Sequence, residues 1–304
     1  METCNITILD GGMGRELEHR GAPFKQPEWS ALAMMEAPEM VKEIHKDFIN
    51  SGAQVIMTNS YALVPFHIGE QRFRDRGEEL AAAAGRAARA AVEETQTGTR
   101  VAGSIPPLFG SYRADLYQPE RVAEIASPLI KGLSPYVDLW LCETQSLIDE
   151  PKRVKTLIDS LDSDKKPFWV SFTLEDSEPT SRPLLRSGQP VVEAVIAMAG
   201  MGVDAILFNC CQPEVITDAF QVTRAALSSI HAEEIEIGAY ANAFPPQPKD
   251  ATANEGLDSM RADLTPLSYL DWAQQWQKQG ATLIGGCCGI GPAHIALLAE
   301  KLPA

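Results

Sequence analysis

Apolar stretches about as long as a β-strand recur along the whole chain, and amphipathic segments separate them. Eight such stretches can be read, and their near-continuous Val, Ile and Leu content is typical of strands buried on both faces. We therefore predict strands at Ile6–Gly12, Ala53–Tyr61, Thr99–Pro107, Val137–Thr144, Pro167–Leu174, Val203–Cys210, Ile235–Asn242 and Ala281–Cys288.

The segments between these strands have helical periodicity. Met40–Asn50 places Val41, Ile44 and Phe48 on one face, and Glu78–Glu94 is rich in alanine, the strongest helix former. Proline at the start of several segments suits the first turn of a helix. Further helices are predicted at Glu120–Ser134, Pro151–Leu161, Pro190–Met201, Glu214–Ile230, Pro266–Gln279 and Pro292–Leu302.

A local order of helix, glycine and strand recurs at Ser51–Ile56, Met201–Ile206 and Gln279–Ile284. Glycine after a helix supplies a left-handed cap. Eight βα units in 304 residues predict an α/β fold, a single-domain (β/α)8 TIM barrel that spans residues 1–304. The competing doubly wound sheet has fewer strands and a G-x-G-x-x-G loop after the first strand, which Asp10–Gly14 does not match.

Two stretches, Glu175–Gln189 and Ala243–Thr265, have the proline, glycine and polar content of long loops. Both follow the carboxyl ends of predicted strands, where barrels build their active sites. A role as lid or substrate wall and a role as plain surface loop both remain open.

Composition and charge exclude several classes of partner. The chain carries 26 basic and 41 acidic side chains, for a net charge of −15, and such a surface repels nucleic acid and anionic membranes. No apolar stretch reaches the roughly 18 residues of a membrane span, and the first residues lack the features of a signal peptide. We expect a cytoplasmic protein, whose six cysteines remain reduced.

Four of the six cysteines form two pairs, Cys210-Cys211 and Cys287-Cys288, each at the end of a predicted strand. The carboxyl ends of barrel strands converge on one mouth, and thiolates gathered there favour a zinc ion over simple burial of small apolar side chains. Glycines at 285, 286 and 289 allow a sharp turn around the second pair through unusual φ/ψ values. Spacing alone does not choose between Cys210 and Cys211, because neighbours on a strand point to opposite faces.

The remaining cysteines have simpler interpretations: Cys142 lies inside a predicted strand and is assigned to the core, and Cys4 lies near the terminus.

Asp10 and Glu143 end predicted strands and can perform acid/base chemistry or bind an ammonium group. None of the five histidines ends a strand, which argues against a histidine-based hydrolase or metal site. Trp29 and Tyr61 are candidates to flank a cation.

These residues form an ordered set that resembles the homocysteine S-methyltransferase family over nearly the whole chain. The specific motifs are Leu9–Gly14, Asn209-Cys210 and the glycine-flanked cysteines of Gly285–Gly289. Intermediate matches are Trp29–Ala31, Thr58–Tyr61, Ala102–Ser104 and Cys142–Thr144. The resemblance implies a zinc-containing barrel enzyme that methylates the thiol of homocysteine to give methionine.

The resemblance also assigns roles to residues. It implies that Cys210, Cys287 and Cys288 are the catalytic zinc ligands, and it thereby selects Cys210 over Cys211. It implies that Asp10 and Glu143 hold the amino group of homocysteine. The matched motifs further place Asn209, Ser104 and Tyr61 at the substrate.

The methyl donor is less well defined, because members of the family use S-methylmethionine, S-adenosylmethionine, betaine or a folate or corrinoid route. The chain ends soon after the eighth βα unit and leaves no room for the additional modules of the folate and betaine enzymes, so we expect a sulfonium donor. The run Pro106–Arg113 departs from the glycine-proline-tyrosine run of the S-methylmethionine enzymes. Another thiol or selenol as acceptor, or betaine as donor, therefore remains an alternative.

Two further hypotheses remain. A non-enzymatic barrel that binds zinc or senses thiols would use the same cysteines, but it gives Asp10 and Glu143 no reason to share the mouth. An unrelated barrel enzyme would have purely structural cysteines. The sequence does not define an oligomeric state.

Overall fold

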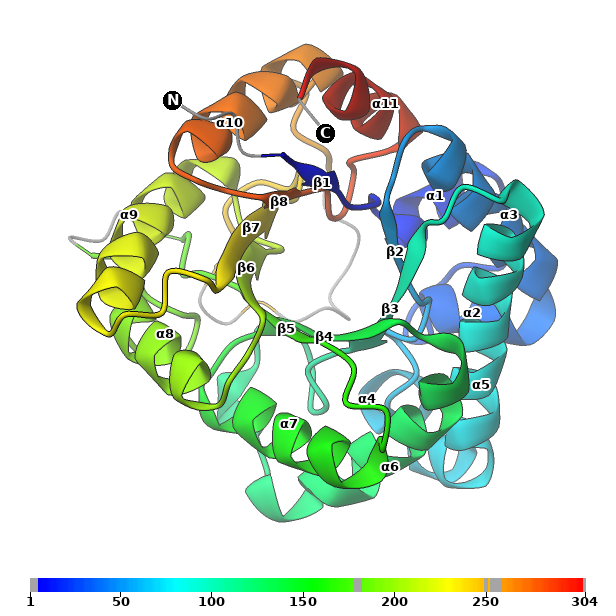
Figure 1. Cartoon of the computed structure of the whole chain (residues 1–304). Coiled ribbons are helices and arrows are strands. Elements are labelled where there is room, and N and C mark those ends of the chain that lie inside the picture. The colour runs from blue at the N-terminus through cyan, green and yellow to red at the C-terminus, as the bar shows by residue number, and fades with distance from the viewer. Residues whose placement is uncertain (1–4, 178–181, 249–250, 252–258, 303–304) are drawn as a thin grey trace.

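A computed structural model describes residues 5–177, 182–248, 251 and 259–302. Eight parallel strands form one sheet in the order β1-β8-β7-β6-β5-β4-β3-β2, and a parallel bridge between Leu9 and Val55 joins its two edges. The sheet is therefore a closed ring, seen along its axis in Figure 1. The strands are β1 (Thr7–Ile8), β2 (Val55–Met57), β3 (Arg100–Ile105), β4 (Leu139–Gln145), β5 (Phe168–Phe172), β6 (Ala205–Asn209), β7 (Glu236–Tyr240) and β8 (Leu283–Ile284).

Helices surround the ring on all sides (Figure 1). They are α1 (Met13–His19), α2 (Ser30–Glu36), α3 (Pro38–Asn50), α4 (Pro65–Ile68), α5 (Glu70–Thr95), α6 (Val122–Leu133), α7 (Asp149–Leu161), α8 (Val191–Gly200), α9 (Pro213–Ser229), α10 (Pro266–Lys278) and α11 (Pro292–Lys301). Short 3-10 turns lie at Ala114–Leu116, Pro119–Arg121 and Ser134–Tyr136. Among the described residues, no helix combines the length and the apolar character that a membrane span requires.

The predicted (β/α)8 barrel is confirmed, and each predicted strand and helix overlaps an observed one. The helix expected at Glu78–Glu94 begins earlier, at Glu70. Three short helices, α1, α2 and α4, were not predicted, because segments of four to seven residues are too short for hydrophobic periodicity to identify.

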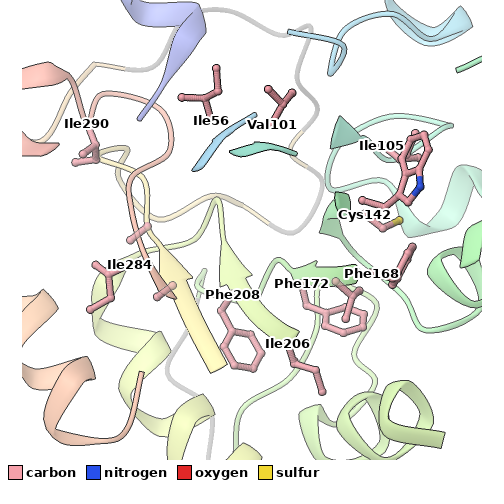
Figure 2. Packing of buried hydrophobic residues seen from close by; sticks show 14 of the residues in the cluster. Ile56, Val101, Ile105, Cys142, Phe168, Phe172, Ile206, Phe208, Ile284 and Ile290 are labelled. Carbon is pink, nitrogen blue, oxygen red and sulfur yellow. The ribbon is translucent and has the colours of Figure 1, made fainter. Parts of the chain in front are cut away.

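Alternation along the strands divides the core into two layers. Leu139, Leu141 and Leu207 belong to a small cluster inside the barrel. Their neighbours Trp140, Cys142 and Phe208 face outward and belong to a larger cluster between the strands and the helices. Figure 2 shows outward members of β5 and β6, among them Phe172, Ile206 and Phe208. The inner layer leaves the carboxyl ends of the strands free for polar side chains.

Candidate active site

A cavity of about 220 Å³ opens at the carboxyl ends of the strands. The carboxylate, guanidinium and thiol side chains that line it are those of Asp10, Arg15, Glu143, Cys210, Cys287 and Cys288. Its aromatic walls are Phe24, Trp29, Tyr61, Tyr112, Tyr240 and Phe244. The cavity therefore combines two carboxylates, three thiols and one guanidinium with a largely aromatic enclosure.

The sulfur atoms of Cys210, Cys287 and Cys288 all lie within 4.8 Å of one another. Cys210 directly follows β6, and the other two cysteines follow β8. In a tetrahedral zinc site with Zn–S bonds of about 2.3 Å, neighbouring sulfur atoms are separated by about 3.8 Å. The soft donor set and its spacing therefore fit a zinc ion.

Local backbone geometry brings the three thiols together. Cys210 has a φ of +50°, so it turns out of the strand direction and lines the cavity, whereas Cys211 is fully buried in the outer hydrophobic layer. Gly289 has a φ of +84°, as the predicted turn requires. Gly285 does not have a positive φ, and it is required for space instead, because a Cβ there would lie 2.5 Å from the Cβ of Leu9.

The three thiols also shift one another's pKa values. Hydrogen bonds from Cys210 and Cys287 lower the pKa of Cys288 well below its usual range, and the contacts with Cys210 and Cys288 raise the pKa of Cys287. One sulfur of the cluster therefore carries negative charge more readily than a lone cysteine. Such a cluster attracts a soft cation.

Glu143 is buried beside the thiols and is held at both carboxylate oxygens. Ser104 donates a hydrogen bond to Oε1, and the hydroxyl of Tyr240 donates to Oε2 at 3.3 Å. Burial raises the pKa of Glu143 to about 7 in spite of these hydrogen bonds. A cationic ligand group in the cavity would favour the ionised form.

Asp10 is only 3% exposed and lines the same cavity. Its Oδ2 accepts a hydrogen bond from the backbone N–H of Met57 at 2.8 Å, but its Oδ1 has no partner among the described residues. Burial raises the pKa of Asp10 well above its usual range, and the nearby charge of Glu143 adds to this effect. A buried carboxylate oxygen without a partner is unfavourable, so it indicates a ligand that donates a hydrogen bond there.

The other predicted substrate residues divide into two groups. Tyr61 lines the cavity and its hydroxyl lies 2.7 Å from the Oγ of Ser111. Ser104 and Asn209 are fully buried and do not line the cavity. Ser104 contacts Glu143 and Asn209 contacts Thr144, so the structure places both behind the wall and not at its surface.

Several residues of the cavity were not singled out individually from the sequence. Among the described residues, Arg15 is the only lysine or arginine that lines it, and its guanidinium lies 5.3 Å from the ring centre of Phe244. Tyr112 lines the cavity from the run that departs from the family pattern, and its hydroxyl donates to the carbonyl of Cys210 at 3.3 Å. Tyr240 is at an inward position of β7, and strand alternation was the signal that could have found it.

The two predicted loops differ in their relation to the cavity. The described part of Ala243–Thr265 supplies Phe244 and Gln247 to the wall, whereas no described residue of Glu175–Gln189 lines it. Cys4 and the loop residues 178–181, 249–250 and 252–258, which the predictions from the sequence also cover, lie outside the described residues.

Comparison with known proteins identifies the family. The homocysteine S-methyltransferase family model matches residues 7–302. The chain belongs to the homocysteine S-methyltransferase family. A curated homocysteine S-methyltransferase from Escherichia coli K12 is 32% identical over 321 residues, which cover 99% of this chain and 96% of the relative. A selenocysteine methyltransferase from Astragalus bisulcatus is 27% identical and covers 95% and 90%.

Solved structures of family members agree with this assignment. The metallated form of the homocysteine methyltransferase MmuM from Escherichia coli has a TM-score of 0.75 at 30% identity, and the alignment covers 98% of this chain and 96% of that one. The oxidized form of MmuM has a TM-score of 0.75 at 29% identity. The resemblance inferred from the sequence is therefore confirmed, and the chain is a methyltransferase of the homocysteine S-methyltransferase family.

Proposed function

We propose that this protein transfers a methyl group from a sulfonium donor to the thiol of homocysteine and that it requires zinc. The observation that carries the proposal is the group of three sulfur atoms within 4.8 Å of one another in a cavity that also holds Asp10 and Glu143. Family membership supports homocysteine as the acceptor. The thiol cluster supports the metal, and the aromatic walls support a cationic donor.

Cys210, Cys287 and Cys288 would hold the zinc ion. A free thiol with a pKa near 8.5 is only a few per cent ionised at neutral pH, and zinc supplies the chemistry that lowers this pKa for a substrate sulfur. The proton of the substrate thiol would pass to solvent water on binding, so the cavity would need no general base at the sulfur.

Asp10 and Glu143 would bind the ammonium group of homocysteine. The unpartnered Oδ1 of Asp10 accepts one N–H, and Glu143, oriented by Ser104 and Tyr240, accepts another. Because both carboxyl groups are buried, charge-assisted hydrogen bonds to them are strong. The amino group would thereby be fixed, and the four bonds between the nitrogen and the sulfur of homocysteine would allow the sulfur to reach the thiol cluster.

Arg15 would bind a substrate carboxylate, because no other lysine or arginine in the described part of the chain lines the cavity. Its ion pair with Glu18 on the same helix, at 2.7 Å, and its contact with the ring of Phe244 restrain the guanidinium at the cavity wall. A planar guanidinium matches a carboxylate in a bidentate geometry. An α-amino acid would therefore find both of its charges paired.

Aromatic side chains would surround the methyl donor. Trp29 and Tyr61 line the cavity, and Phe24 supports Trp29 through an edge contact with ring centres 5.5 Å apart. Aromatic faces attract sulfonium cations. The thiolate attacks the methyl carbon as the carbon–sulfur bond to the donor breaks, the electron pair stays on the donor sulfur, and the donor leaves as a neutral thioether. Alignment of the three atoms provides much of the acceleration.

The test supplies purified zinc-containing protein with homocysteine and, separately, S-methylmethionine, S-adenosylmethionine or betaine. We expect methionine with a sulfonium donor and none with betaine. Methionine formed only with betaine would overturn the donor assignment. Absence of methionine with every donor, while selenocysteine is methylated in a parallel assay, would overturn the acceptor assignment.

A further inference from the structure

Strand β4 departs from regular pairing beside Glu143, which lines the cavity. Cys142 pairs with Val170 of β5 and Gln145 pairs with Phe172, so three residue steps on β4 face two on its neighbour. The extra residue is a β-bulge at Glu143 and Thr144. Bulges near active sites redirect a side chain, and this one directs Glu143 into the cavity.

The bulge requires an unfavourable backbone conformation. Thr144 has a φ of +55°, in the left-handed region that a β-branched residue rarely adopts. Thr144 is fully buried, so neither solvent nor an exposed turn relieves the conformation. A specific set of contacts must therefore hold it.

The side chain of Asn209 supplies these contacts. Its Oδ1 accepts from the backbone N–H of Thr144 at 3.0 Å, and its Nδ2 donates to the hydroxyl of Thr144 at 2.8 Å. The same Oδ1 accepts from the hydroxyl of Ser171 on β5 at 2.6 Å. An amide at the end of β6 therefore reaches across β5 and fixes the bulge of β4.

Asn209 also precedes Cys210 directly, and Cys210 is itself in the left-handed region at φ +50°. We propose that Asn209 is a positioning residue that fixes Glu143 and Cys210 relative to each other, and so sets the distance between the amine site and the thiol cluster. This inference rests on the proposed function. The amide touches neither substrate nor cavity, so its effect is transmitted through Thr144 and through the backbone of Cys210.

The decisive comparison is Asn209→Ala against the double variant Asn209→Ala/Thr144→Gly. We expect Asn209→Ala to raise the KM and the calorimetric Kd for homocysteine at least about tenfold, a typical effect of removing a supporting hydrogen bond, with zinc content unchanged. Glycine adopts a positive φ without the steric cost of a Cβ. The double variant should therefore recover part of the lost affinity, whereas two merely structural losses would add.

Thr223→Ala serves as the matched control. Thr223 is fully buried on α9, and its hydroxyl donates to the carbonyl of Ala219 at 2.8 Å, so the variant loses a buried hydrogen bond away from the cavity. It should leave the homocysteine KM unchanged. If Asn209→Ala does not fold, Ser171→Ala removes one of the three contacts of Asn209 and should raise the same KM severalfold.

An unchanged homocysteine KM in folded Asn209→Ala or Ser171→Ala protein would overturn the positioning role. A double variant with the same or weaker affinity than Asn209→Ala would overturn it as well. These outcomes are read against wild-type protein that forms methionine. A wild-type protein that forms none would instead contradict the proposed function.

Discussion

Arg186 and Asp176 form a buried ion pair, with 3.2 Å between Nη1 and Oδ1 and side-chain exposures of 1% and 2%. The guanidinium also donates to the carbonyls of Gln247 and Pro248, and the N–H of Gln247 donates to Asp176. The pair therefore joins the loop after β5 to the loop after β7. Because the guanidinium lies 5.2 Å from the ring centre of Tyr112, it also supports a wall of the cavity.

Replacing Arg186 should destabilise the protein. Burial already raises the pKa of Asp176 to about 6 despite the nearby guanidinium, and Arg186→Met leaves this carboxyl without its cation. Loss of one partner of a buried pair costs about 3–5 kcal/mol. Urea unfolding measures the change. The exposed pair of Arg76 and Glu79 provides the control, because Arg76→Met should cost less than about 0.5 kcal/mol. Equal losses in the two variants would contradict the expectation.

Zinc content should depend on three cysteines and not on their neighbours. We expect about one zinc per chain in the purified protein, as for a single three-cysteine site. Cys210→Ser, Cys287→Ser and Cys288→Ser should each lose most of it in metal analysis. Cys142→Ser and Cys211→Ser are the controls, because both side chains are buried in the outer layer. Zinc loss in the Cys211 variant with retention in the Cys210 variant would reverse the ligand assignment.

Glu143→Gln should weaken homocysteine binding and leave zinc in place. A charge-assisted hydrogen bond contributes about 1.5–3 kcal/mol, so we expect KM to rise about 10- to 100-fold. Glu150 offers a matched control: it is buried, burial raises its pKa to about 7, and it accepts from the N–H of Leu108 without lining the cavity. Glu150→Gln should leave KM unchanged. Wild-type kinetics for Glu143→Gln would remove Glu143 from the amine site.

His45 should make stability depend on pH. It is fully buried on α3 without a hydrogen-bond partner among the described residues, and burial lowers its pKa from 6.5 to about 3. Between pH 6.5 and about 3, His45 is protonated in the unfolded chain but stays neutral in the folded protein. The free energy of unfolding therefore decreases progressively as the pH falls through this range. The slope is at most about 1.4 kcal/mol per pH unit.

The measurement is the difference in unfolding free energy between wild type and His45→Leu at pH values from 5 to 7.5. This difference should shift in favour of the variant as pH falls. A difference that stays constant over this range would contradict the depressed pKa of His45. The comparison cancels other groups that titrate, since both proteins contain them.

The sequence predicted the barrel because buried parallel strands leave long apolar runs, and it predicted the thiol cluster because glycine-flanked cysteines end two of them. It did not choose between Cys210 and Cys211 without the family resemblance, because the choice depends on a positive φ at Cys210 that strand alternation does not predict. Tyr112, at a φ of +68°, lies beyond the strand predicted at Thr99–Pro107, where alternation does not predict the direction of a side chain.

The prediction for Asn209 shows a different limit. Motif position identified it as important, but a motif does not separate a side chain that touches substrate from one that supports its neighbour. Only the contacts with Thr144 and Ser171 make that distinction. Likewise, Gly285 was expected to permit an unusual φ, and it is needed to admit Leu9.

The closure of the ring joins the two ends of the chain. The N–H of Gly286 donates to the carbonyl of Asp10 at 2.9 Å, and the cysteines that follow Gly286 come from the last strand to be synthesised. A nascent chain that has not yet emerged beyond residue 280 contains Cys210 alone of the three sulfur atoms. The proposed metal would therefore be captured late in biosynthesis, after the first and last strands of the barrel have met.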